Sequence, residues 1–270
     1  MSGDQASAFK QIEIYLGRCW RGFVNDKGWK VFISVVLITA IIGLVLGDDT
    51  FERYADTKNG AFALVCACIW IGIFNSIRTV CRERDIVKRE HRTGLNFASY
   101  IASHWIYEAA LCLVEALIVT VIVALICYDH FIDAGVFAPP AVELFVTFFL
   151  ITFSSDALGL LISSIVRSEN TAMTVMPFAL IIQLVLSGVI FKLEGVAEYI
   201  SYLTISRWGL DAICATAHMN EMLEVGVGQA ESVVEYAATF ENLVGLWGIL
   251  LLFAVCYGVL SIVALRAFND

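Results

Sequence analysis

Long runs without Asp, Glu, Lys or Arg dominate the chain. Four of these runs are 17 to 24 residues long and cover residues 31–47, 59–77, 170–191 and 242–265. About 17–25 apolar residues cross the roughly 30 Å of bilayer hydrocarbon, and one charge at its centre costs at least about 2.5 kcal/mol. Two further apolar stretches, 98–127 and 143–166, contain acidic residues but are long enough to span. The pattern therefore predicts an all-α membrane protein with six transmembrane helices.

The segments outside these runs have patterns of their own. In residues 7–27, apolar side chains recur at steps of three and four, with charged residues between them: Phe9, Ile12, Leu16, Trp20 and Phe23. This periodicity predicts an amphipathic helix in the membrane interface, and the alternative is a helix packed on a soluble domain. Residues 192–241 are acidic and have no proline between 196 and 222, which predicts a short helical cap between spans five and six.

The composition supports the membrane assignment. Hydrophobic residues make up 59% of the 270 residues and charged residues 16%, and the mean hydropathy is +0.80. A soluble domain has about 45–50% apolar and about 25% charged residues, so this class is excluded and lipid is an expected partner. The net charge of −9 argues against a nucleic-acid partner, because phosphates would be repelled overall.

Lys and Arg are distributed unevenly among the predicted loops. With cytoplasmic termini, four of the 17 lie outside, at Arg53, Lys58, Lys192 and Arg207, and the other 13 lie inside. Cytoplasmic loops of membrane proteins carry the excess of Lys and Arg. We therefore expect a multi-pass protein of the cell membrane, a bacterial cytoplasmic membrane, with both termini in the cytoplasm.

The segment 82–94 mixes both signs of charge: three acidic residues alternate with five bases and a histidine. A cluster of cytoplasmic bases would not by itself include acids. Alternating charges suit a short helix with i,i+3 and i,i+4 pairs that docks on a polar protein surface. From composition alone, a merely solvated helix is an equally good interpretation.

Five stretches resemble ABC-2-type permeases, most closely the transmembrane domain of the ABCG (White) subfamily and its bacterial relatives. They are, in chain order, the helix 9–23 before the first span, Glu83-Arg84-x-Ile86-x-x-Arg89-Glu90-His91, the 158–168 segment LGLLISSIVRS, the 183–188 segment QLVLSG and the 200–209 segment ISYLTISRWG. Ile182 and Ile205 stand where the family has prolines. The resemblance covers nearly the whole chain and implies the six-span fold with an N-terminal connecting helix.

The resemblance also implies a function: the permease subunit of an ABC exporter. The residues of segment 82–94 that match the family's coupling helix are Glu83, Arg84, Arg89, Glu90 and His91. The chain has no G-x-x-x-x-G-K-[ST] phosphate loop, so ATP and Mg²⁺ are expected on a separate ATPase subunit and no cofactor on this chain. A second permease chain, identical or related, is the other expected partner. No catalytic residue and no metal ligands are predicted.

In the resembled family, the second and fifth spans of two protomers enclose the substrate cavity. The matching positions here are Trp70, Phe74, Asn75, Met176 and Gln183. The family's outer plug of two bulky residues matches Val189 and Ile190. An apolar cavity implies a hydrophobic or amphipathic substrate. Lipid contact or packing within the bundle is an equally good interpretation of these apolar residues.

Three acidic residues lie inside predicted spans: Glu108, Glu115 and Asp156, with His104 one turn before Glu108. Intramembrane carboxylates are candidate functional groups. They could serve a proton-coupled carrier or an intramembrane enzyme, a function of a different class that needs no ATPase. We favour a structural role, hydrogen bonding across the bundle, because the resembled family draws its energy from ATP.

Overall fold

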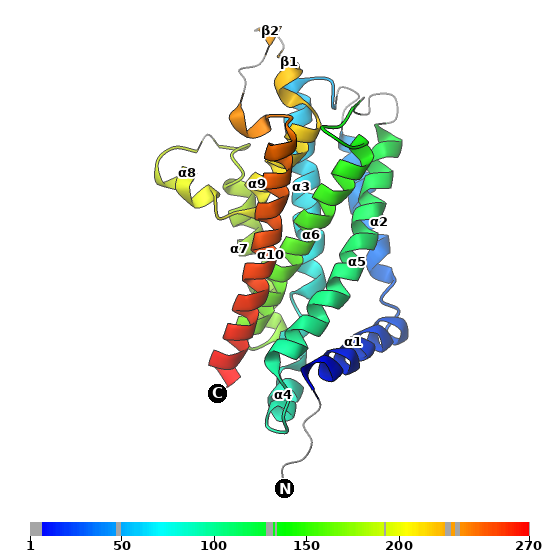
Figure 1. Ribbon diagram of the computed structural model, residues 1–270, viewed down its shortest axis with the longest axis vertical. Helices are drawn as coiled ribbons and strands as arrows, with labels where there is room; N and C mark the ends of the chain where they lie inside the picture. The colour runs from blue at the N-terminus through cyan, green and yellow to red at the C-terminus, as the bar shows by residue number, and fades with distance from the viewer. Residues whose placement is uncertain are drawn as a thin grey trace.

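The computed structural model describes residues 7–46, 50–127, 132, 134–191, 193–224, 228–229 and 233–269, and it is almost entirely helical (Figure 1). Its long helices are α1 (Ala8–Asn25), α2 (Lys30–Val45), α3 (Tyr54–Ser76), α4 (Thr79–His91), α5 (Phe97–Ile126), α6 (Pro140–Ile165), α7 (Glu169–Val185), α9 (Ile205–Thr216) and α10 (Phe240–Asn269). The shorter elements are α8 (Val196–Ser201), the 3₁₀ turns η2 (Met219–Glu221) and η3 (Val234–Tyr236), and the antiparallel two-residue strands β1 (Leu223–Glu224) and β2 (Gly228–Gln229).

Helices α3 and α6 form the centre of the bundle. In the most apolar stretch of each, 67% of the residues are buried inside the protein, against 39% for α5 and 33% for α10. α6 packs against α3, α5 and α10, while the outer faces of α5 and α10 expose leucine and valine side chains. The apolar excess of the sequence therefore lies on the periphery, where lipid would solvate it.

Two glycines bring α3 and α6 close together. A side-chain carbon on Gly72 would clash with the carbonyl oxygen of Thr152 and lie 2.9 Å from the backbone nitrogen of Asp156. One on Gly159 would clash with the hydroxyl of Ser76. Small residues permit this backbone approach in membrane bundles, where packing replaces the hydrophobic effect as the driving force.

Four helical stretches of the described chain are long and apolar enough to span a membrane: Tyr54–His91, Phe97–Ile126, Pro140–Ile165 and Phe240–Ala267. A fifth results if α1 and α2, which meet at a bend of 72°, are counted as one broken span. α7 is apolar but only 17 residues long. The structure thus has four to five apolar spans, and the predicted count of six rests on α2 and α7 each crossing the bilayer alone.

The described part of the chain begins and ends at the same end of the bundle. α1, α4 and the C-terminal end of α10 are together there, whereas α8, β1 and β2 lie at the opposite end (Figure 1). The charged segment predicted at 82–94 is largely contained in α4, which begins earlier, at Thr79, and ends earlier, at His91. Its start is fixed by the hydroxyl of Ser163, which accepts hydrogen bonds from the backbone nitrogens of Val80 (3.0 Å) and Cys81 (3.1 Å).

The segment predicted as an outer cap, 192–241, contains α8, α9, η2, β1, β2 and η3. Arg207 joins three of these elements: it donates to Ser201 at 2.6 Å, lies 4.0 Å from the ring of Tyr202 and pairs with Glu235 at 3.6 Å. α9 differs from a surface cap because ten of its twelve residues are buried, packed against α3, α6 and α10. Lys192 and residues 225–227 and 230–232 of the predicted cap are outside the described residues.

Candidate functional site

One arginine of α1 joins this helix to α4. The guanidinium of Arg18 lies 3.1 Å from Glu83 and 3.5 Å from Glu90. These two acids are seven residues apart, so they project from the same face of α4 two turns apart. All three side chains are about one third exposed, which leaves the charge pairs accessible to water at the end of the bundle. We call Arg18, Glu83 and Glu90, with the tyrosines described next, the α1–α4 clasp.

Two tyrosines complete the clasp. The hydroxyl of Tyr15 donates to Glu90 at 2.8 Å, and that of Tyr100, on α5, donates to Glu83 at 3.2 Å. The two rings meet edge to face, with centroids 5.7 Å apart. Burial, and then the hydrogen bond to Glu90, raises the pKa of Tyr15 to about 12. The phenol therefore stays protonated near neutral pH and remains a donor to Glu90.

Arg84 points to a different element. Its guanidinium donates to the carbonyl oxygens of Ser164 (2.6 Å) and Val166 (2.8 Å), where α6 ends. These are carbonyl groups that the helix itself leaves without partners, so a cation is well placed there. Because the clasp holds α1 and Arg84 holds α6, α4 is attached to both sides of the bundle at once.

The other two predicted coupling residues have different surroundings. His91 lies with Nδ1 2.8 Å from the carbonyl oxygen of Leu95 and stacks on Phe97 at 3.9 Å, which fixes the turn into α5. Arg89 lies on the exposed face of α4. This face also carries Arg82, Asp85, Lys88 and Arg92. Among the predicted coupling residues, Arg89 is therefore the one that faces away from the described helices of the chain, where a partner could bind it.

A cavity of about 330 Å³ lies between α2 and α3. Trp70, Phe74 and Asn75 line it from α3, and the first two are 45% and 39% exposed. Apolar residues of α2 such as Val35 and Ile38 form the other wall. The predicted trio of α3 residues thus shares an apolar cavity, although its other wall is α2 rather than α7.

The α7 residues predicted for the cavity lie elsewhere. Met176 and Gln183 are buried within the chain. The side-chain carbonyl of Gln183 accepts a hydrogen bond from the backbone nitrogen of Ser206 at 3.1 Å, and its backbone carbonyl accepts one from the Ser206 hydroxyl at 2.6 Å. These two bonds join α7 to the start of α9. Val189 packs against the core beyond the end of α7, and the neighbouring Ile190 is exposed. A role in a substrate path stays a prediction for all four.

The intramembrane acids are buried but have unequal surroundings. Both carboxylate oxygens of Glu115 accept from the side-chain amide of Asn75 at 2.9 Å. Neither carboxylate oxygen of Asp156, nor Oε2 of Glu108, has a hydrogen-bond partner among the described residues. His104 lies with Nδ1 3.6 Å from the sulfur of Cys19 on α1. Hydrogen bonding across the bundle is thus present at the carboxylate of Glu115, and the role of all three acids stays a prediction.

Sequence reasoning missed Tyr15, Arg18 and Tyr100. The seven-residue spacing of Glu83 and Glu90 was a usable signal, because it places both acids on one face of the helix, where one cation can pair with both. That this partner is 65 and 72 residues away on α1 could be known only from the structure.

A bundle of long apolar helices with a charged helix at one end and an apolar cavity on its flank is the architecture of an integral membrane protein. The chain belongs to the ABC-2 type transporter family, whose model matches residues 10–217. It is also 29% identical, over 234 residues, to the ABC transporter ATP-binding/permease protein Rv1747 of Mycobacterium tuberculosis (strain ATCC 25618 / H37Rv). That match covers 82% of this chain, which spans only 27% of the relative's length. The chain is thus similar to a part of a protein whose name combines ATP binding with a permease.

Proposed function

We propose that the chain is the permease subunit of an ABC exporter that moves a hydrophobic or amphipathic substrate out of the cytoplasm or the inner leaflet. An ATPase subunit would supply the energy, and two permease chains, identical or related, would complete the complex. The observation that carries the proposal is the double attachment of α4: the clasp joins it to α1, and Arg84 joins it to the end of α6. A force applied to α4 would therefore reach both sides of the bundle.

The proposed orientation puts α1, α4 and the C-terminal end of α10 in the cytoplasm. The excess of Lys and Arg in the segments at this end supports it. ATP binding would close the ATPase subunits against α4 and shift the cavity from inward-open to outward-open, so that cargo passes Val189 and Ile190. The exposed side chains of Trp70 and Phe74 on α3, and of Phe178 and Ile181 on α7, support a face that a second permease chain covers.

The ATPase is proposed as a partner because the 270 residues carry no phosphate loop. The name of the mycobacterial relative combines ATP binding and permease in one protein. This supports a physical association of the permease with an ATPase, whether the two are separate subunits or parts of one polypeptide. Purification of the tagged chain from its native membranes, followed by an ATPase assay, tests the proposal. We expect an ABC ATPase and ATP hydrolysis in the purified complex; a preparation with neither would overturn the proposal.

Reversing one charge on the exposed face of α4 should weaken ATPase docking. Arg89→Glu changes a side chain that contributes no described contact inside the chain, so folding should be unchanged, while association with the ATPase should weaken about tenfold at low salt. Binding of purified ATPase to the permease in nanodiscs, measured at two salt concentrations, checks this. Lys10→Glu, an equal reversal on the exposed face of α1, is the control. Equal affinity of Arg89→Glu and wild type would remove α4 from the docking surface.

The alternative, a proton-coupled carrier or intramembrane enzyme using His104, Glu108, Glu115 and Asp156, predicts activity without an ATPase. The unpartnered oxygens of Glu108 and Asp156 favour a ligand or a proton at these groups. Activity that survives ATP depletion but is lost in Glu108→Gln would support this alternative over the exporter.

A further inference from the structure

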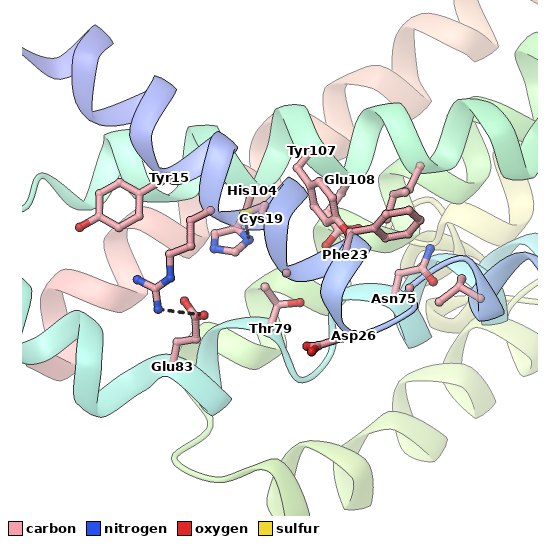
Figure 2. Close-up of a pocket in the computed structure, with 15 residues that line it drawn as sticks. Tyr15, Cys19, Phe23, Asp26, Asn75, Thr79, Glu83, His104, Tyr107 and Glu108 are labelled. Atoms are coloured by element: carbon pink, nitrogen blue, oxygen red, sulfur yellow. Dashed lines mark hydrogen bonds and ion pairs between the residues drawn. The ribbon is translucent and has the colours of Figure 1, made fainter.

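A second cavity, of about 350 Å³, lies between α1, α5 and the junction of α3 with α4 (Figure 2). Its inner wall carries His104, Tyr107 and Glu108 of α5, and its α1 wall carries Cys19 and Phe23. Asp26, exposed at the end of α1, also lines it. Tyr15, Arg18 and Glu83 of the clasp also line this cavity. It therefore carries more charged and polar side chains than the apolar α2–α3 cavity.

Glu108 is the unmatched group of this cavity. Its side chain is only 3% exposed, and Oε2 has no hydrogen-bond partner among the described residues. Glu115, two turns further along the same helix, is by contrast satisfied by Asn75 through both oxygens. Because a buried carboxylate without a partner costs free energy, Glu108 is poised for a ligand that supplies a donor or a positive charge.

The chain's own cation in this cavity is already engaged. Arg18 lines the cavity, but its guanidinium is paired with Glu83 and Glu90. His104 is buried in the same wall, with Nδ1 3.6 Å from the sulfur of Cys19. The carboxylates of Glu108 and Asp26 therefore leave an excess of acidic groups along the cavity wall.

Aromatic rings line this cavity together with Glu108. Tyr107 and Phe23 meet edge to face with ring centroids 6.3 Å apart, and Figure 2 draws both in the same cavity as Glu108. A carboxylate in a cavity that two aromatic rings also line suits an ammonium group, which the ring quadrupoles attract and the carboxylate neutralises. An anionic or purely hydrocarbon group gains neither interaction here.

The two cavities are lined by common residues. Asn75 and Val31 line both, so the polar cavity adjoins the apolar one between α2 and α3. We propose that together they bind an amphipathic amine, with its ammonium group at Glu108 in the cavity that Tyr107 and Phe23 also line, and its hydrocarbon chain in the α2–α3 cavity. This inference rests on the proposed exporter function and narrows its substrate class to cationic amphiphiles.

Photoaffinity labelling tests the site directly. The full permease–ATPase complex in nanodiscs, without ATP, is labelled with a diazirine-bearing dodecylammonium probe, and the labelled peptides are identified by mass spectrometry. We expect labelling in α1 near Phe23 and in α5 near Glu108. Unlabelled dodecylammonium should compete at least tenfold better than dodecyl sulfate, a comparison that needs no variant.

Two matched variants locate the charge. Glu108→Gln should reduce labelling at least tenfold, whereas Glu13→Gln, the same change on the exposed face of α1 and outside this cavity, should retain it. Equal labelling in Glu108→Gln and wild type, or equal competition by the sulfate, would overturn the amine site. Because labelling needs no ATP, the site can fail while ATP-driven export holds, and export can fail while the site holds.

Discussion

Replacing Gly72 with valine should strongly destabilise the helix bundle. The new side chain would meet the backbone of α6 at Thr152 and Asp156, and a backbone contact cannot be relieved by a rotamer change. We expect a loss of roughly 3 kcal/mol or more, the upper range for overpacking, which is a large part of a typical stability of about 5–15 kcal/mol. The unfolding midpoint of the purified protein in detergent should fall by roughly 6 °C or more.

The control for this prediction is Gly248→Val on α10. A side-chain carbon at Gly248 meets nothing within 4 Å, and the residue is exposed, so the midpoint should change little. If both variants unfold at the wild-type midpoint, the close approach of α3 and α6 is wrong. If both are equally destabilised, the effect belongs to valine in a membrane helix and not to the helix crossing.

Replacing Glu90 with alanine should separate ATP hydrolysis from transport. The change removes the acceptor for Tyr15 and one of the two carboxylates that hold Arg18, so that among the described residues Glu83 is the carboxylate of α4 that still pairs with Arg18. We expect the complex to assemble and hydrolyse ATP at its basal rate, while stimulation by cargo and transport both fall at least tenfold. ATPase and uptake assays on the same reconstituted preparation measure the two effects together.

Glu13→Ala is the matched control for Glu90→Ala. It removes the same charge from the exposed face of α1, away from the clasp, and should leave coupling unchanged. Full transport in Glu90→Ala would show that the clasp does not transmit force. An equal loss in Glu13→Ala would attribute the effect to net charge at this end of the bundle.

The hydrophobic pattern predicted the long helices well but not where they end. The run 59–77 became α3, which begins at Tyr54, and the run 242–265 became α10, which begins at Phe240. A charge-free run marks the hydrocarbon-facing part of a helix, whereas hydrogen bonding continues the helix into the polar region. The run 170–191 failed in the other direction: α7 ends at Val185, ahead of Gly188, which has a left-handed φ of 79°.

The site was predictable as a segment but not as a network. The alternating charges of 82–94 marked α4, and the resemblance to ABC-2-type permeases selected Glu83 and Glu90 within it. The partners Arg18 and Tyr15 lie more than 60 residues earlier, in a helix whose apolar stripe gave no sign of them. The polar cavity at Glu108 was likewise not predictable, because it depends on how α1 crosses α5 and not on any local pattern.

The most direct test of the central claim is uptake into inside-out membrane vesicles that contain the complex. A panel of amphipathic compounds is offered with ATP, with a non-hydrolysable ATP analogue, or with a proton gradient alone, and uptake is measured by mass spectrometry. An ATP-driven exporter with an α4-coupled bundle predicts accumulation with ATP only, lost in Glu90→Ala and retained in Glu13→Ala. Uptake driven by the proton gradient without ATP, or no ATP-dependent uptake of any compound in the panel, would contradict it.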